Sequence, residues 1–127
     1  MCRILFIDDN SETVEAIAMR LARARPGWNI RTITSSQRAL RLLDTEPADV
    51  VVTDLRMPVL NGEALLGRIK KHHPQTVRVV LSGDAGAALA AKVASLCHFF
   101  LKKPCLASEM LKVLDQVCES HGVAESS

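Results

Sequence analysis

Short apolar runs recur along the chain, and segments of helical periodicity separate them. Most of these runs are nearly continuous, which is typical of strands buried on both faces of a sheet. The predicted strands are residues 4–7, 29–33, 50–53, 77–81 and 99–101. Residues that favour turns lie at both ends of each run. The runs between them are shorter than a buried helix would be.

The intervening segments carry helix signals. After the first strand, Asn10 or Ser11 provides an N-cap, and apolar residues from Val14 to Leu21 lie at helical spacing. Pro26 then ends the helix. Similar signals predict a helix capped by Ser35 or Ser36, helices over about residues 64–73 and 87–95, and a last helix from a cap at Ser108 to about residue 120. Regular alternation of strand and helix predicts a single doubly wound α/β domain, with a parallel five-stranded sheet and right-handed crossovers.

Reactive side chains follow four of the predicted strands. They are Asp8, Asp9, Asp54, Ser82, Lys102 and Lys103. Each signal alone also fits a turn residue or a solvated side chain, but all of them fall at the same end of their strands. Ligands of open parallel sheets bind outside the carboxyl ends of the strands, so we expect these side chains to converge at one edge.

Three aspartates at one edge repel each other unless a cation neutralises them. Mg²⁺ suits such a site, because it prefers one or two carboxylates together with water and phosphate oxygens. One aspartate is alternatively a nucleophile that forms an aspartyl phosphate. Lys103 would supply further positive charge for phosphoryl transfer, which depends mainly on positioning and charge neutralisation.

Composition narrows the function classes. The chain of 127 residues is 48% apolar, with three Phe, one Trp and no Tyr, which argues against a surface for stacking bases. Its net charge of +2 indicates neither nucleic acid nor a membrane surface as partner. No apolar run approaches the ~20 residues of a membrane span, and the first run ends in two aspartates, unlike a signal peptide. We therefore expect a cytoplasmic protein.

The four cysteines show no ligand spacing for a metal. Cys2, Cys97, Cys105 and Cys118 form no CxxC motif. We expect all four to be reduced thiols that are buried or partly exposed.

In order and spacing, the segments at the strand ends resemble the receiver domains of bacterial two-component response regulators, including the chemotaxis receiver. The matching segments are residues 7–9, 53–58 with 61–62, 81–83 and 100–104, and the resemblance covers essentially the whole chain. It implies a flavodoxin-like (βα)5 fold with strand order 2-1-3-4-5. It also implies a receiver domain over residues 1–121, with residues 122–127 as a disordered tail or the start of a linker.

The resemblance assigns the chemistry at the strand ends. It implies that Asp54 is the phosphoacceptor and that Lys103 contacts the phosphoryl group. Asp8, Asp9, Asp54 and the backbone carbonyl of Arg56 would hold Mg²⁺. The protein would not be an enzyme, beyond its own phosphorylation and autodephosphorylation.

The resemblance also implies a switch and partners. Ser82 would move its hydroxyl onto the phosphoryl group, Phe100 would follow, and the face of the fourth helix, fifth strand and fifth helix would change. The partners would be a sensor histidine kinase or phosphotransfer protein and a downstream output domain or protein. A homodimer through the same face is a further expectation.

Other functions remain open at this point. The chain is alternatively the regulatory module of a larger signalling enzyme, such as a cyclic-di-GMP phosphodiesterase, or a degenerate receiver used only for binding. An aspartyl-phosphate phosphatase fits less well, because it usually needs a second carboxylate two residues beyond its nucleophile. Asn10 follows Asp8 at that spacing and Arg56 follows Asp54. The sequence does not specify the kinase, the output partner or the lifetime of the phosphoryl group.

Overall fold

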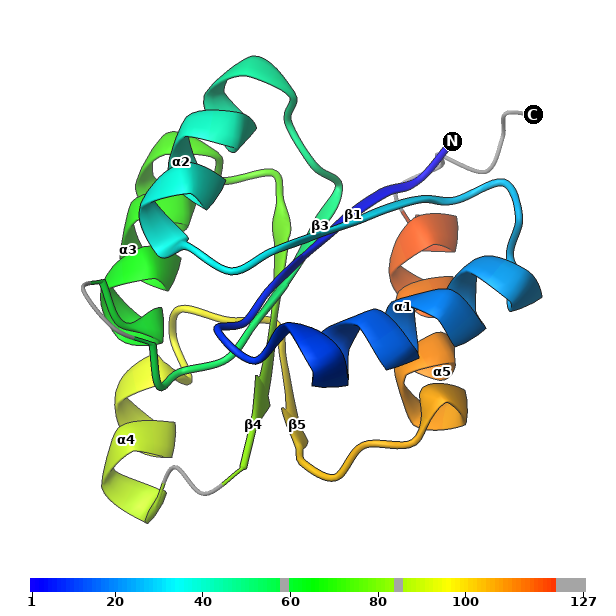
Figure 1. The fold of residues 1–127 in the computed structure, drawn as a ribbon. Coiled ribbons are helices and arrows are strands. Elements are labelled where there is room, and N and C mark those ends of the chain that lie inside the picture. Colours follow the sequence, from blue (N-terminus) through cyan, green and yellow to red (C-terminus); the bar gives the residue numbers. More distant parts are fainter. Residues whose placement is uncertain (58–59, 84–85, 121–127) are drawn as a thin grey trace.

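The computed structural model describes residues 1–57, 60–83 and 86–120, in which five strands alternate with five helices (Figure 1). The strands are β1 (Arg3–Ile7), β2 (Asn29–Ile33), β3 (Val50–Thr53), β4 (Val77–Ser82) and β5 (Phe99–Lys102). The helices are α1 (Ser11–Ala24), α2 (Ser36–Thr45), α3 (Gly62–His72), α4 (Gly86–Val93) and α5 (Ala107–Ser120). Pro58 of the matching segments and the expected tail, residues 122–127, lie outside the described residues.

All neighbouring strands are parallel, and their order is β2-β1-β3-β4-β5, so the predicted doubly wound fold and strand order are confirmed. Helices α1 and α5 cover one face of the sheet, and α2, α3 and α4 cover the other (Figure 1). The register pairs Ile7 with Thr53 and Ser82 with Lys102. This register aligns the carboxyl ends of the strands along one edge.

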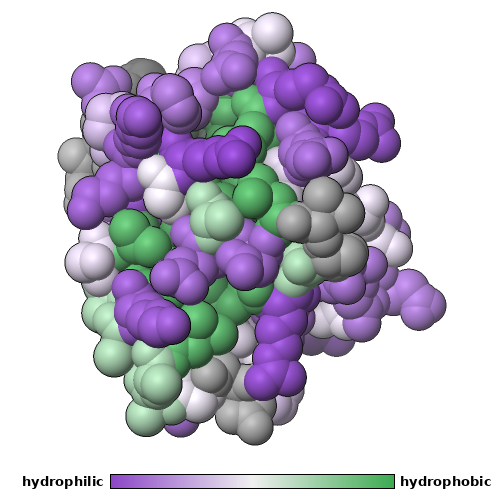
Figure 2. Space-filling model, turned by 90° about the vertical axis from the view of Figure 1, so that its left-hand side faces the viewer, coloured by the Kyte–Doolittle hydropathy of each residue, from purple (hydrophilic) through white to green (hydrophobic). Residues whose placement is uncertain are grey.

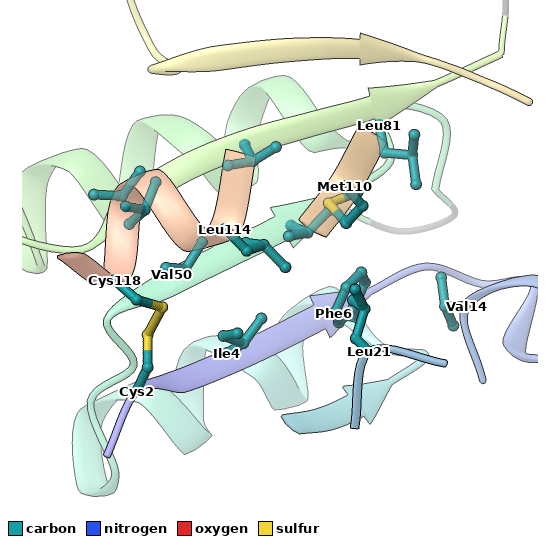
Figure 3. Close-up of a cluster of buried hydrophobic side chains, with 14 residues drawn as sticks. Cys2, Ile4, Phe6, Val14, Leu21, Val50, Leu81, Met110, Leu114 and Cys118 are labelled. Carbon is teal, nitrogen blue, oxygen red and sulfur yellow. A yellow bond between two sulfur atoms is a disulfide. The ribbon is translucent and has the colours of Figure 1, made fainter. Parts of the chain in front are cut away.

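The apolar runs of β1, β3 and β4 are buried because their alternate residues contact helices on opposite faces. Ile4 and Phe6 of β1 lie in the cluster shared with α1 and α5, together with Leu114 (Figure 3). Leu5 and Ile7 lie in a separate cluster with residues of α2 and α3. Near-continuous apolar sequence is therefore the signature of a strand covered on both sides.

Short polar side chains set the helix starts. Asn10 accepts a hydrogen bond from the Thr13 amide, and Ser35 caps α2 in the same way. The expected cap at Ser108 is wrong, because α5 already begins at Ala107. Instead, the Glu109 carboxylate accepts a hydrogen bond from the Leu106 amide at 2.9 Å. This contact is the acidic half of a capping box, which ties down the first turn without a Ser cap.

The expectation that all four cysteines are reduced is wrong for two of them. Cys2 and Cys118 form a disulfide, with Cα atoms 6.0 Å apart, at one end of the cluster between the sheet, α1 and α5 (Figure 3). The last turns of α5 pack beside the start of β1, and this packing brings together residues 116 positions apart. Cys97 and Cys105 are free and partly buried, as expected.

Two cations hold the segment that follows α4. Lys70 of α3 donates to the carbonyl of Ser95 at 3.0 Å, and Arg78 of β4 donates to that of Leu96 at 2.7 Å. His98 is exposed, and its Nδ1 accepts a hydrogen bond from the Arg78 amide at 3.0 Å. The C-terminal end of α4 is thus tied to both α3 and β4.

The face formed by α2, α3 and α4 is mixed in character. Figure 2 shows hydrophilic residues over much of its upper part and more hydrophobic residues in its lower part, where α4 lies. The sequence of α4 is largely alanine, with Ala87, Ala88 and Ala91 exposed. Among the described helices, none combines the length and apolar character needed to span a bilayer.

Candidate functional site

Three carboxylates converge at the carboxyl edge of the sheet, as predicted. The backbone continues the ladder beyond the strands, because the Asp54 amide donates to Ile7 at 3.1 Å. Asp8 and Asp54 therefore leave adjacent strands at the same level, and Asp9 follows directly. Carboxylate oxygens of Asp8, Asp9 and Asp54 lie within 4.8 Å of one another. Asp8 is buried, Asp54 half-buried and Asp9 exposed.

Lys103 reaches this cluster from the end of β5. Its Nζ lies 2.8 Å from Oδ2 of Asp8 and 3.5 Å from Oδ2 of Asp54. Its amide donates to the carbonyl of Ser82 at 2.8 Å, which fixes the backbone beside β4. Lys102 is exposed, so the two neighbouring lysines have different environments.

The carboxylates keep Lys103 charged. Burial by itself lowers the pKa of the ammonium, but the hydrogen bond to Asp8 and the charges of Asp54 and Asp8 outweigh it. The pKa of Lys103 is therefore raised above its ordinary value. At neutral pH the group is a permanent cation directed at two carboxylates.

One lysine does not balance three aspartates. Within the described part of the site, the cluster carries a negative excess that Lys103 only partly offsets. Several carboxylate oxygens gathered at one place are the type of ligand that a hard divalent cation prefers. The chemistry of these residues therefore fits Mg²⁺.

The carboxylate of Asp54 is oriented by its own loop. Its Oδ1 accepts hydrogen bonds from the amides of Leu55 at 2.7 Å and Arg56 at 3.4 Å. These bonds leave Oδ2 as the oxygen directed at Lys103. The side chain of Arg56 is exposed, and the role of its carbonyl as a metal ligand stays a prediction.

Ser82 ends β4 at the same edge as the carboxylates, whereas Phe100 lies two residues before the end of β5. Ser82 is 1% exposed, and its Oγ has no hydrogen-bond partner among the described residues. Phe100 is partly buried and packs against the cluster that includes Val80 and Val93. Buried polar groups usually have a hydrogen-bond partner. The unpaired hydroxyl of Ser82 could therefore form a hydrogen bond with a polar group that enters the site.

Thr53 and Gly62 also contact the backbone of Asp54, and the sequence alone predicted no functional role for either. Thr53 donates its hydroxyl to the carbonyl of Asp54 at 2.9 Å, and Gly62 packs directly against the same backbone. In the sequence, Gly62 belongs to the matching segment 61–62, and the structure makes it the first residue of α3, after the N-cap Asn61. Nothing in the sequence indicated the contact of Thr53.

Comparison with known proteins gives one family. The model of the response regulator receiver domain matches residues 4–115. The hydrogenase transcriptional regulatory protein HoxA of Cupriavidus necator is 26% identical over 122 residues, which cover 94% of this chain and 25% of that protein. The DNA-binding transcriptional regulator NtrC of Azospirillum brasilense is 30% identical over 119 residues, covering 93% of this chain and 24% of NtrC. The chain thus spans about a quarter of the length of these curated relatives.

A solved structure agrees in fold. The signal receiver domain of an HD domain-containing protein from Pseudomonas fluorescens Pf-5 is 28% identical and has a TM-score of 0.85. The match covers 94% of this chain and 95% of the solved one. The similarity therefore extends over nearly the whole of both chains.

Proposed function

The chain belongs to the response regulator receiver domain family, and we propose that it receives a phosphoryl group on Asp54 and passes this change to a protein partner. Asp8 and Asp9 would hold Mg²⁺ with Asp54, Lys103 would bind the phosphoryl oxygens, and Ser82 and Phe100 would form the switch. A signalling module of this kind is not an enzyme that turns over a separate substrate.

The observation that carries the proposal is the arrangement around Asp54. Its Oδ2 faces the ammonium of Lys103, and the carboxylates of Asp8 and Asp9 lie within the same cluster. A carboxylate nucleophile, a cation for the incoming charge and an oxygen-rich cation site are the components of phosphoryl transfer to aspartate.

The reaction follows from these positions. An Asp54 carboxylate oxygen attacks phosphorus of a phosphohistidine donor, the new P–O bond forms and the P–N bond breaks. The leaving imidazole takes a proton from solvent. Lys103 remains protonated and stabilises the charge on the transferred oxygens. When bound, Mg²⁺ supplies positive charge for those oxygens and orients them.

The added charge provides the signal. A phosphoryl group brings about 1.5 to 2 negative charges and three strong acceptor oxygens. Ser82 at the end of β4 has a buried hydroxyl without a partner among the described residues, and this hydroxyl would donate to the phosphoryl oxygens. The C-terminal end of α4 is tied to Lys70 and Arg78, so a displacement of the helix would begin at the end nearer the site.

Partners are inferred from the family. The phosphoryl donor would be a sensor histidine kinase or a phosphotransfer protein, and the response would pass to an output domain or protein in the cytoplasm. The relatives include transcriptional regulators, and one solved relative is part of an HD domain-containing protein. Because the chain spans about a quarter of those curated relatives, a regulatory module of a larger protein is compatible with the same chemistry. No observation supports the homodimer through α4, β5 and α5, which stays a prediction.

The test is direct phosphorylation. The protein is incubated with Mg²⁺ and acetyl phosphate, and the intact mass is measured; beryllofluoride binding is followed in parallel by NMR. We expect one phosphoryl adduct, which does not form when EDTA is present from the start to remove Mg²⁺. Absence of an adduct on the parent protein would contradict the proposal.

Three substitutions assign the residue. Asp54→Asn removes the nucleophile and should abolish the adduct. Asp44→Asn makes the same chemical change at an exposed position of α2, whose carboxylate pairs with His73, and should leave the adduct intact. Ser82→Ala should still form the adduct but show smaller NMR changes in α4 and β5 when beryllofluoride binds.

A further inference from the structure

The backbone carbonyl of Asp54 lies between two groups that are not part of the reacting set. On one side, Thr53 Oγ1 donates a hydrogen bond to it at 2.9 Å. On the other side lies Gly62, at the start of α3. A Cβ atom on Gly62 would come within 2.4 Å of this carbonyl oxygen and 2.5 Å of the Leu55 Cα. Real Cβ atoms do not approach backbone this closely, so only glycine fits without a shift of the chain.

The remaining polar atoms of Asp54 are restrained as well. Its amide donates to Ile7 of β1 at 3.1 Å, and its Oδ1 accepts from the Leu55 amide at 2.7 Å. Gly62 in turn donates its own amide to the carbonyl of Leu55 at 2.9 Å. Every polar atom of the residue therefore has a partner, and Oδ2 accepts from Lys103 Nζ at 3.5 Å.

We infer that Thr53 and Gly62 are positioning residues for phosphoryl transfer, because together they fix the carbonyl of Asp54 and thereby the direction of its carboxylate. This inference rests on the proposed function of Asp54 as the phosphoacceptor. Neither residue touches the phosphoryl group. Both act through the backbone of Asp54 and Leu55, whose amide orients Oδ1.

The side chain of Thr53 is suited to this role by its burial. The residue is 1% exposed, and its hydroxyl also lies 3.8 Å from the sulfur of Met57. Ser36, the first residue of α2, donates to the carbonyl of Leu60 at 2.7 Å and lies 3.6 Å from the same sulfur. The loop after Asp54 is thus held by buried hydroxyls of β3 and α2. Solvent does not compete for these hydrogen bonds.

The first experiment compares two glycines of α3. Gly62→Ala would push against the backbone of Asp54, whereas a Cβ on Gly67 meets nothing within 4 Å. Both changes replace glycine by alanine in the same helix, where alanine has the higher helix propensity. We expect the rate of phosphorylation by acetyl phosphate to fall about 10- to 100-fold in Gly62→Ala, since small misplacements of reacting groups have effects of this size. Gly67→Ala should react at the parental rate.

The second experiment removes one hydroxyl without changing the fold. Thr53→Val keeps the shape of the side chain and loses the bond to the Asp54 carbonyl, while Thr53→Ser keeps the hydroxyl. We expect Thr53→Val to react about 3- to 30-fold more slowly, and Thr53→Ser to restore most of the rate. A purely structural role for Thr53 would not give this rescue, because serine loses a buried methyl group that valine retains.

A spectroscopic measurement makes the inference testable apart from phosphorylation. The amides of Leu55 and Arg56 donate to Oδ1 of Asp54, so their NMR signals report its orientation. We expect these signals to move in Gly62→Ala and Thr53→Val, and to stay in place in Gly67→Ala. If the parent protein takes no phosphoryl group, the proposed function fails while these signals still test the positioning. The inference is overturned if the Leu55 and Arg56 signals are unmoved in the folded Gly62→Ala and Thr53→Val variants, or if both variants react as fast as the parent.

Discussion

The ammonium of Lys103 lies 2.8 Å from Oδ2 of Asp8, whose side chain is 3% exposed, while the lysine side chain retains 24% of its exposure. A buried carboxylate in this position depends on its cation, because removal of one partner leaves an uncompensated charge. The same lysine also approaches Asp54, so a single cation serves two carboxylates from different strands.

Lys103→Met should therefore destabilise the protein in the absence of divalent cations. Methionine retains much of the apolar stem, and we expect the free energy of unfolding to fall by about 2 kcal/mol, less than for a fully buried pair because Lys103 is partly exposed. Added Mg²⁺ should restore part of the loss by neutralising the same carboxylates. Urea denaturation with and without Mg²⁺ measures both effects. Lys102→Met, at the exposed neighbour, is the matched control, and equal losses in the two variants would contradict the prediction.

Ser82→Ala should leave the resting protein as stable as the parent or more stable. The hydroxyl is buried and has no hydrogen-bond partner among the described residues, so its removal relieves a desolvated polar group. We expect the free energy of unfolding to rise by up to about 1 kcal/mol, measured by thermal or urea denaturation without Mg²⁺. A loss of 1 kcal/mol or more would mean that the hydroxyl already has a stabilising partner.

Reduction of the Cys2–Cys118 disulfide should lower stability without unfolding the protein. The bond closes a long loop of the unfolded chain, and disulfides of this kind typically contribute about 2–4 kcal/mol. The two free thiols would still pack in the buried cluster as small apolar groups (Figure 3). Denaturation with and without a phosphine reductant measures the change, and alkylation with mass spectrometry verifies the redox state. The Cys2→Ala/Cys118→Ala double variant should be insensitive to the reductant, and an equally large response in it would assign the effect elsewhere.

The two free cysteines should react slowly with alkylating agents at neutral pH. Burial raises the pKa of Cys97, although Arg78 offsets part of the effect, and burial together with the charge of Glu109 raises that of Cys105. The thiolate is the reactive form, so a raised pKa lowers its population at any pH below the new value. The rate of iodoacetamide labelling should therefore rise with pH at a higher midpoint in the folded protein than in urea. Coincident midpoints would show that the environment does not shift these thiols.

The sequence predicted the strands well because burial on both faces leaves a continuous apolar signal. Val50 to Thr53, which is buried throughout, begins and ends as predicted. Asn29 to Ile33 also begins and ends as predicted, although this strand mixes polar and apolar residues and is only partly buried. The site followed from the same signal, since Asp8 and Asp54 directly follow strands and parallel strands end at a common edge. The family resemblance added the strand order, which alternation alone does not contain.

Contacts between distant segments could not be predicted in this way. The cap at Ser108 was wrong because the side chain of Glu109 stabilises the first turn of α5 from the opposite direction. The pairing of Cys2 with Cys118 depends on how α5 packs beside β1, which no local pattern records. The steric fit of Gly62 against Asp54 likewise exists only after β3 and α3 have come together.

The disulfide also has a consequence for the path of a signal. Cys2 precedes β1 and Asp8 follows it. The disulfide therefore attaches the end of α5 to the end of the sheet that is opposite to Asp54. The length of β1, roughly 17 Å at the usual rise per residue, separates the disulfide from the carboxylates. The peptide that follows α5 in a longer protein would therefore start from this far end of the sheet. A change at Asp54 would reach a domain attached there either through the packing of α5 or by direct contact of that domain with α4 and β5.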